Sequence, residues 1–288
     1  MNKARIKAVI KRLFDYRPVK HTTIELKSVE CSSLLKGRCA LITGGTSGIG
    51  YAIAAALLQA GAMVIITGRN QNRLSDAVKV LSSKGQVMGF VLDNTDVDSY
   101  GTVFEQMISS AQSKGASDID ILVNNAGVNF KGMPNATEEE YDQVMDTNLK
   151  GAFFLSQMFG KYLVANKIRG NILNIASASS LRPADSAYTL SKWGLRGLTL
   201  GLAKSLAQYG ITVNGIAPGP TATPMMKKDE TSNMTLDRIP LGRYITPEEI
   251  ANMAVLLVGD MGRSIMGDIV YMTGGAGLLT YDDVNYSF

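Results

Sequence analysis

The residues of this sequence with a clear capacity for chemistry include a tyrosine and a lysine four positions apart, Tyr188 and Lys192. On a helix, side chains at this spacing lie one above the other on the same face. An ammonium held beside a phenol favours the phenolate, so Tyr188 could release or accept a proton near neutral pH. The hypothesis is that Tyr188 is the general acid/base of a hydride-transfer enzyme. Surface helices also produce this spacing by chance, so the rest of the chain must supply a site around the pair.

A glycine-rich segment, TGGTSGIG at 43–50, lies between an apolar stretch and a helical one. Glycines let the backbone turn sharply and approach a pyrophosphate, which then meets the N–H groups at the start of the helix. The position of the segment predicts a dinucleotide-binding turn. The alternative is an ordinary tight turn between a strand and a helix.

The choice between the two nicotinamide cofactors depends on the end of the second apolar stretch, which reads Gly68, Arg69, Asn70. A carboxylate there would bind the ribose 2′-hydroxyl of NAD(H) and repel a 2′-phosphate. This chain has no carboxylate at that place, and the guanidinium of Arg69 can pair with a phosphate. The sequence therefore predicts NADP(H) rather than NAD(H).

Seven short apolar stretches, separated by helical segments, must position these residues. Strands that are apolar on both faces and alternate with helices form a parallel sheet covered on both sides. The sequence thus predicts an α/β fold, a doubly wound seven-stranded parallel sheet of the Rossmann-like kind. The expected strands lie within 38–45, 62–68, 86–93, 119–127, 170–177, 211–219 and 267–275.

Two of the expected helices begin with a capping box, Thr137 with Glu140 and Thr246 with Glu249. The first box opens a long helical stretch that is predicted to run from 138 to about 166. The other expected helices include 48–61, 71–85 and about 100–111.

Between 220 and 244 the chain has no clear period and carries three methionines, Met225, Met226 and Met234. Flexible apolar side chains suit a lid that closes over a substrate. The alternative is an ordinary mobile connection.

The composition of the chain, 288 residues with 45% apolar and 19% charged, is that of a soluble globular protein with a large core. Its only histidine, His21, argues against a Ser-His-Asp triad and a multi-histidine zinc site, so no metal site is expected. The two cysteines, Cys31 and Cys39, argue for a reducing compartment. With no apolar run near the roughly 20 residues that cross a bilayer and no signal-peptide core, we expect a cytoplasmic protein.

A basic N-terminal extension, 1–34, precedes the expected oxidoreductase domain at 35–288. Residues 1–36 hold nine Lys or Arg against three acids, which gives +6; because the whole chain carries +4, the remainder carries −2. A nucleic-acid partner for the body of the protein is therefore not expected. Apolar residues recur at helical spacing between Ile6 and Phe14. This helix would pack on the body or on a sister subunit; contact with an anionic membrane surface is the less favoured alternative.

Six motifs in order carry a resemblance to a known family. They are TGGTSGIG at 43–50, NNAG at 124–127, Asn148, NIAS at 174–177, YTLSK at 188–192 and PGPTATP at 218–224. Together they resemble the short-chain dehydrogenase/reductase family, in its compact single-domain branch with TGxxxGxG spacing. The extended branch uses TGxxGxxG, and Ser47 falls where that pattern needs glycine. The resemblance covers the chain from about Leu35 onward.

The resemblance implies a catalytic set of Asn148, Ser177, Tyr188 and Lys192. Tyr188 would exchange a proton with the substrate oxygen, and Ser177 would hydrogen-bond that same oxygen. Lys192 would lower the tyrosine pKa and bind the nicotinamide ribose. Asn148 would hold a water that links the lysine to solvent.

Two members of this set have alternatives. Ser179 and Ser180 are close enough to compete with Ser177, which is favoured because it directly follows the Asn-Ile-Ala strand end. Asn148 could instead be an amide inside a helix that bonds to nearby backbone.

The resemblance also implies the cofactor contacts. Asp93 would contact the adenine, although it could be only a cap or turn residue, and Thr46 and Ser47 stand where many NADP-using relatives carry a basic residue. The implied contacts are Gly44, Thr46, Ser47, Gly48, Ile49, Gly50, Arg69, Asp93, Asn125, Ala126, Gly127, Tyr188, Lys192, Pro218, Gly219, Thr221 and Thr223.

The sequence thus favours an NADP(H)-dependent carbonyl reductase or alcohol dehydrogenase that acts on a small molecule. One alternative is a 3-oxoacyl-carrier-protein reductase, for which Lys227, Lys228 and Arg243 would form only a thin basic patch. Another is a non-catalytic NADP(H)-sensing protein, which would not need the proton-transfer residues. The resemblance further implies a homotetramer or homodimer.

Overall fold

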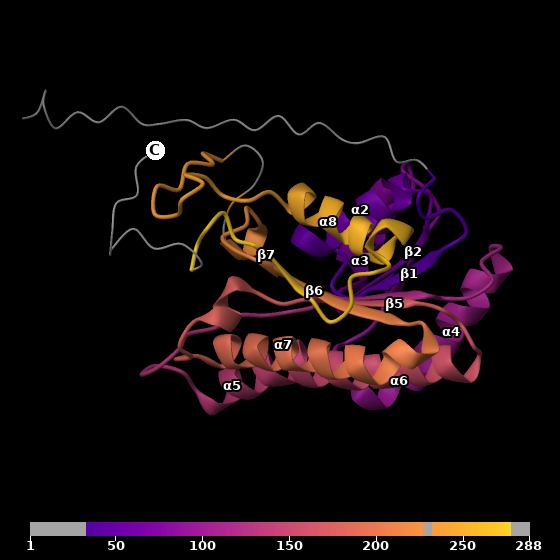
Figure 1. The fold of residues 1–288 in the computed structure, drawn as a ribbon, viewed down its shortest axis with the longest axis horizontal. Coiled ribbons are helices and arrows are strands. Elements are labelled where there is room, and N and C mark those ends of the chain that lie inside the picture. Colours follow the sequence, from indigo (N-terminus) through magenta and orange to yellow (C-terminus); the bar gives the residue numbers. More distant parts are fainter. Residues whose placement is uncertain (1–32, 227, 229–231, 278–288) are drawn as a thin grey trace, which may run out of the picture.

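The computed structural model describes residues 33–226, 228 and 232–277, so the predicted N-terminal helix lies outside the described residues. A seven-stranded parallel sheet in the order β3-β2-β1-β4-β5-β6-β7 forms the centre (Figure 1). This confirms the predicted doubly wound α/β fold. The strands are β1 (Cys39–Ile42), β2 (Met63–Gly68), β3 (Val87–Val91), β4 (Ile121–Asn124), β5 (Asn171–Ile175), β6 (Thr212–Pro218) and β7 (Ile269–Met272).

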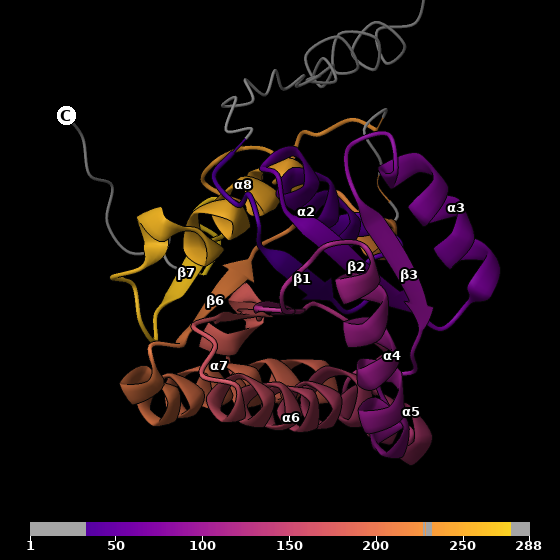
Figure 2. The ribbon, with the colours of Figure 1, turned by 90° about the vertical axis from the view of Figure 1, so that its right-hand side faces the viewer.

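Helices cover both faces of the sheet (Figure 2). One layer contains α2 (Gly48–Gln59), α3 (Gln71–Leu81) and α8 (Pro247–Val258). The other contains α4 (Tyr100–Ser113), α5 (Glu138–Met145), α6 (Gly151–Ala165) and α7 (Ala187–Leu206). No helix among the described residues is long and apolar enough to cross a membrane.

The core has two halves, one on each face of the sheet. In β1, Ala40 and Ile42 pack in the half beneath α2 and α8, whereas Cys39 and Leu41 pack in the half beneath α4 and α6. Alternate residues of a strand point to opposite faces, so a strand buried on both faces is apolar throughout. This is why β1, CALI, is a continuous apolar run, whereas β5 also buries the amides of Asn171 and Asn174.

The predicted helix from 138 to about 166 differs from the observed structure. A π-helical turn, Asp146–Lys150, separates α5 from α6. The wider turn directs the Asn148 side chain at the backbone of Val128. Its Oδ1 accepts from the Val128 N–H at 2.8 Å, and its Nδ2 donates to the Val128 carbonyl at 3.0 Å. Such turns are frequent at functional sites, and apolar periodicity gives no signal for them. Both predicted capping boxes are present.

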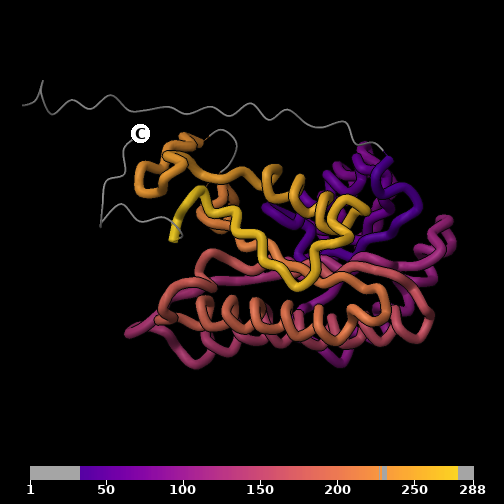
Figure 3. Tube along the Cα trace, in the orientation of Figure 1, coloured from indigo at the N-terminus to yellow at the C-terminus, as the bar shows by residue number. Residues whose placement is uncertain are grey.

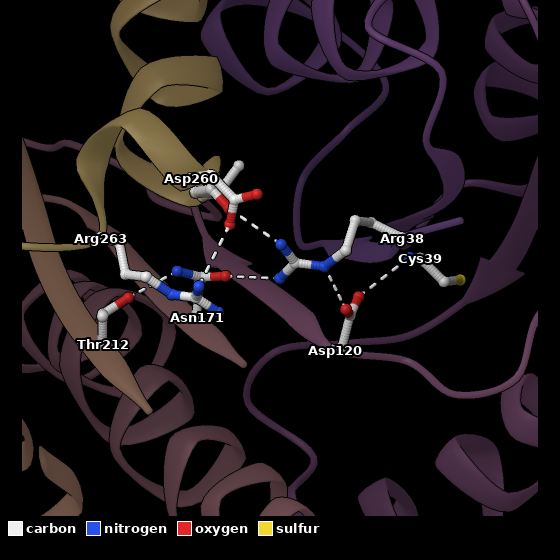
Figure 4. Close-up of polar contacts among 8 residues, drawn as sticks. Arg38, Cys39, Asp120, Asn171, Thr212, Asp260 and Arg263 are labelled. Carbon is white, nitrogen blue, oxygen red and sulfur yellow. Dashed lines mark hydrogen bonds and ion pairs between the residues drawn. The ribbon is translucent and has the colours of Figure 1, made fainter. Parts of the chain in front are cut away.

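A network of polar side chains joins the amino-terminal ends of four strands (Figure 4). Arg38, just before β1, forms an ion pair with Asp120, just before β4. Its Nη2 also donates to Asn171 Oδ1 at 2.6 Å, and Asn171 Nδ2 donates to Thr212 Oγ1 at 2.5 Å. We call Arg38, Asp120, Asn171 and Thr212 the amino-end network. It fixes the starts of β1, β4, β5 and β6 relative to one another.

The segment between β6 and α8 loops outward beside the chain that follows β7 (Figure 3). Leu241 donates a backbone hydrogen bond to Gly274 at 2.9 Å. Met234 is buried, whereas Met225 and Met226 are exposed.

Candidate active site

A cleft of about 470 Å³ lies at the carboxyl-terminal ends of the strands. It is centred where β1 has β2 on one side and β4 on the other, the point at which open α/β sheets bind ligands. Most of the predicted cofactor-binding residues line it. They are Gly44, Thr46, Ser47, Gly48, Ile49, Arg69, Asp93, Asn125, Ala126, Gly127, Tyr188, Lys192, Pro218, Gly219, Thr221 and Thr223.

The glycine-rich turn is held by the chain after β4. Asn125 Nδ2 donates to the carbonyls of Thr43 and Gly44 at 2.9 and 3.0 Å. A Cβ on Gly50 would lie 2.3 Å from this Nδ2 and 2.5 Å from the Gly44 carbonyl oxygen. Gly50 is absent from the wall of the cleft, in contrast to the other glycines of the predicted cofactor set. Gly50 instead allows α2 to pack closely against the turn.

The start of α2 is suited to bind an anion. The N-cap residue, Ser47, makes no side-chain hydrogen bond to the helix, and the first turn carries no acid. Free N–H groups and the positive end of the helix dipole therefore face the cleft, where a pyrophosphate would be stabilised. The glycine turn leaves room for close approach, so the residues present fit a dinucleotide.

Asp93 and Arg69, predicted to hold the adenosine half of the cofactor, have neighbours that the sequence did not indicate. Asp93 accepts hydrogen bonds from the backbone N–H and the hydroxyl of Thr95, both at 2.9 Å, so it acts as a turn residue and also lines the cleft. Arg69 lines the cleft with Arg73, a residue that the sequence analysis did not select. The available signal was its position four residues after Arg69, in the first turn of the next helix.

Tyr188, Lys192 and Ser177 converge at the other end of the cleft. The start of α7 is fixed by Ser186, whose side chain accepts from the backbone N–H of Thr189 at 3.3 Å. Lys192 is only 5% exposed, and its Nζ lies 5.6 Å from the centroid of the Tyr188 ring. The same Nζ donates to the carbonyl of Ile175, at the end of β5, at 2.8 Å. The helix and the strand thus bring the ammonium and the phenol together.

Burial governs the protonation of this pair. It raises the pKa of Tyr188, and a hydrogen bond with the Ser177 side chain acts in the opposite direction. It also lowers the pKa of Lys192 to about 8, because an ammonium is poorly solvated there. Ser177 is the neighbour that acts against burial here, and the lowering of the tyrosine pKa by Lys192 stays a prediction.

The neighbouring serines have other partners. Ser180 Oγ donates to the carbonyl of Ser177 at 2.7 Å, and the backbone N–H of Ser179 donates to Ser177 Oγ at 3.1 Å. Of these three residues, only Ser177 lines the cleft.

Asn148 is buried behind this group and is absent from the cleft wall. Besides its bonds to Val128, its Nδ2 donates to Ser191 Oγ at 3.2 Å. These partners lie 20 and 43 positions away, so Asn148 does bond to backbone, but to a distant segment and not within its own helix. Ser191 directly precedes Lys192 on α7, which places Asn148 beside the lysine backbone.

The remaining wall comes from the chain after β6. Pro218, Gly219, Thr221 and Thr223 line the cleft, followed by the two exposed methionines at 225 and 226. A Cβ on Gly219 would lie 2.7 Å from the carbonyl oxygen of Thr273, so glycine is required for this close approach.

No cluster of three or more potential His, Cys, Asp or Glu metal ligands occurs within the described part of the chain.

The thin basic patch considered for a carrier protein is partly neutralised. Arg243 forms a two-bond ion pair with Glu249, at 2.9 and 2.8 Å. Lys228 Nζ lies 5.5 Å from the centroid of the Tyr244 ring. Lys227 lies outside the described residues.

Comparison with known proteins gives consistent matches over the main domain. Residues 38–233 match the family model described as short chain dehydrogenase. A 3-oxoacyl-(acyl-carrier-protein) reductase of Thermotoga maritima is 37% identical over 247 residues, covering 84% of this chain and 98% of the relative. A gluconate 5-dehydrogenase of Gluconobacter oxydans is 32% identical over 249 residues, covering 84% and 95%.

Solved structures match over a similar range. A putative gluconate dehydrogenase from Agrobacterium tumefaciens superposes with a TM-score of 0.76 at 33% identity, covering 85% of this chain and 98% of the other. An actinorhodin polyketide ketoreductase variant, solved with NADPH, superposes with a TM-score of 0.77 at 28% identity, covering 86% and 100%.

Proposed function

This chain belongs to the short-chain dehydrogenase/reductase family of oxidoreductases, and we propose that it transfers a hydride between NADP(H) and a carbonyl or secondary alcohol, with Tyr188 as general acid/base. The observation that carries the proposal is a single cleft whose wall includes both the glycine turn and the Tyr188 phenol. Ser177 lines the same cleft, and the Lys192 ammonium lies 5.6 Å from the centroid of the Tyr188 ring.

In the direction of reduction, a nicotinamide held by the glycine turn would supply the hydride that the carbonyl carbon accepts. Tyr188 gives its hydroxyl proton to the carbonyl oxygen, so that the alcohol forms and a phenolate remains. Ser177 donates a hydrogen bond to the same oxygen and holds it at reacting distance. The ammonium of Lys192 stabilises the phenolate until a proton returns. In the direction of oxidation, Tyr188 takes the proton from the alcohol.

The return of the proton is assigned to the region around Asn148. This residue is held by Val128 and by Ser191, the neighbour of Lys192. We infer that a water beside the Asn148 amide connects Lys192 with solvent, because the amide bonds to Ser191, the residue before the lysine.

NADP(H) is proposed over NAD(H) because Arg69 lines the cleft at the end of β2 with no carboxylate at that place. A ketoreductase similar to this chain was solved with NADPH, which agrees with the proposal. The ratio of kcat/KM for NADPH to that for NADH measures the preference. A ratio below one would contradict the role of Arg69.

The test of the mechanism is Tyr188→Phe, with Tyr209→Phe as a control at an exposed tyrosine of the same layer. Turnover should be measured by cofactor absorbance on a panel of ketones and alcohols. We expect Tyr188→Phe to lower kcat by roughly 10²–10⁴-fold, the usual contribution of a general acid, and to keep cofactor binding. Turnover equal to that of the unaltered protein would exclude Tyr188 as the acid.

A second candidate is the reduction of a 3-oxoacyl thioester, favoured by the name of the 37% identical relative. The Arg243–Glu249 pair weighs against docking of an acidic carrier protein, because it removes one cation from the basic patch. Turnover of an acetoacetyl thioester can be compared with turnover of a 5-keto sugar acid, since other similar proteins are named gluconate dehydrogenases. The better substrate decides between these classes.

We further propose that the protein is a cytoplasmic homodimer or homotetramer that associates through α6 and α7. Phe153 and Phe154 are 45% and 37% exposed on α6, beside an apolar groove that includes Leu149 and Gly194. One face thus carries a ridge and a groove, which a two-fold contact between copies requires. Phe154→Glu should dissociate the assembly in sedimentation experiments, whereas Val80→Glu on α3 should not.

A further inference from the structure

The wall of the cleft at the end of β2 carries two guanidiniums rather than one. Arg69 directly follows β2, and Arg73 is the third residue of α3. Both line the cleft, together with Asn70 between them. Gly68, at the end of β2, lies close to Thr46: a Cβ added to Gly68 would lie 2.8 Å from the threonine methyl carbon. The two arginines therefore lie at a corner of the cleft beside the glycine turn.

Neither guanidinium is neutralised by an acid among the described residues. None of the ion pairs found within residues 33–226, 228 and 232–277 involves Arg69 or Arg73. Like charges on one wall of the cleft repel each other, so the free protein gains nothing from this arrangement. An anion bound between the two guanidiniums would attract both of them and outweigh their mutual repulsion.

The helix that carries Arg73 adds to the positive potential. The side chain of Asn70 caps α3 by accepting from the backbone N–H of Arg73 at 3.0 Å. The first turn of α3 has no acidic residue, so its remaining N–H groups and its dipole also favour an anion. Two unpaired cations and one helix start therefore meet at one corner of the cleft.

We propose that Arg73 is a second specificity residue, which binds the 2′-phosphate of NADP(H) together with Arg69. The inference rests on the proposed function, and it extends the cofactor site to a residue outside the family motifs on which the site prediction rested. A phosphate dianion can accept forked hydrogen bonds from two guanidiniums at once. Arg73 contributes only where a 2′-phosphate is present, so it determines the choice of cofactor and not the chemistry at Tyr188.

The experiment measures binding of the adenosine half alone, so that catalysis does not enter. Adenosine 2′,5′-bisphosphate carries the 2′-phosphate and 5′-AMP lacks it, and isothermal titration gives both dissociation constants. The variants are Arg73→Gln, Arg69→Gln and the double variant. Lys79→Gln is the matched control, because it removes a positive charge from the last turn of the same helix.

We expect Arg73→Gln to weaken the bisphosphate about tenfold or more, as for loss of a hydrogen bond to a charged group, and to leave 5′-AMP within about twofold. Lys79→Gln should leave both ligands unchanged. If Arg73→Gln weakens the two ligands equally, or neither of them, while Arg69→Gln affects only the bisphosphate, Arg73 has no part in recognition.

Steady-state kinetics separate this inference from the proposed function. The kcat/KM with NADPH should fall in Arg73→Gln by the same factor as the affinity for the bisphosphate, while the kcat/KM with NADH stays constant. Absence of turnover with both cofactors in the unaltered protein would refute the proposed function. Turnover with a cofactor preference that Arg73→Gln does not change would refute the role of Arg73 alone.

Discussion

The two ends of the central sheet differ in whether polar groups find partners inside the protein. At the amino ends, Arg38, Asp120, Asn171 and Thr212 bond to one another across four strands. At the carboxyl ends, the start of α2 lacks a side-chain cap, and two arginines have no acid partner within the described chain. The same buried strands connect both ends. Polar groups that are satisfied internally stabilise the fold, and we propose that those left without partners bind the cofactor.

The buried charges show the same contrast. Burial raises the pKa of Asp120, although Arg38 and the backbone N–H of Cys39 act in the opposite direction. Burial lowers the pKa of Lys192 to about 8, with no acid beside it to oppose the effect. Both groups lose solvation, but of the two only Asp120 has a counter-ion within the part of the chain that the structure describes. The positive charge of Lys192 is thus available to a phenolate that forms on Tyr188.

The largest expected effect comes from breaking the network at the amino ends. Asp120→Leu leaves the guanidinium of Arg38 partly buried without its carboxylate, because the Arg38 side chain is only 24% exposed. We expect the free energy of unfolding to fall by about 3–5 kcal/mol, the usual cost of removing one partner of a buried pair. Urea unfolding measures the loss. The kcat of the folded fraction should stay unchanged, because the network lies at the opposite end of the sheet from Tyr188.

The double variant Arg38→Met/Asp120→Leu is the control for this prediction. Replacing both charges by apolar side chains removes the desolvation cost together with the attraction, so most of the lost stability should return. If the double variant is no more stable than Asp120→Leu, the loss comes from packing and not from an unpaired charge.

The sequence predicts the two ends unequally well. The glycine turn, Tyr188 and Lys192 are recognisable because each sits in a local motif, and the structure brings them to one cleft. The amino-end network joins residues such as Arg38 and Asp120 that are 82 positions apart, so no local pattern reveals it. The π turn around Asn148 was missed for a related reason: it is set by contacts with Val128, not by the periodicity of its own helix.

A smaller effect should appear in the pH dependence of stability at the carboxyl end. The pKa of Lys192 is about 8 in the folded protein against an ordinary value of 10.5. Between these values the unfolded chain binds more protons, so the stability of the unaltered protein should gain about 3 kcal/mol from this group as pH rises from 8 to 10.5. Lys192→Met lacks this gain. Urea unfolding of the cofactor-free protein at several pH values measures the difference.

Lys204→Met provides the comparison, since Lys204 is exposed on the same helix. Other titrating groups are common to both variants and cancel in the difference. If the free energy of unfolding has the same pH dependence in the two variants, Lys192 is as well solvated as a surface lysine. The two ends of the sheet would then not differ in how they treat a buried charge.

The smallest expected effect tests whether unsatisfied groups near the cleft cost stability. Thr147 lines the cleft, and its buried hydroxyl has no hydrogen-bond partner among the described residues. Thr199 is also buried, but its hydroxyl accepts from Asn174 and donates to the carbonyl of Leu195.

Replacing each threonine by the similarly shaped valine should therefore change the free energy of unfolding in opposite directions. Thr147→Val should raise the free energy of unfolding by about 1 kcal/mol, because an orphaned hydroxyl is removed, and Thr199→Val should lower it by about the same amount. Losses of similar size in both variants would mean that Thr147 has a partner in solution, and the carboxyl end would then be as well satisfied at this position as the amino end.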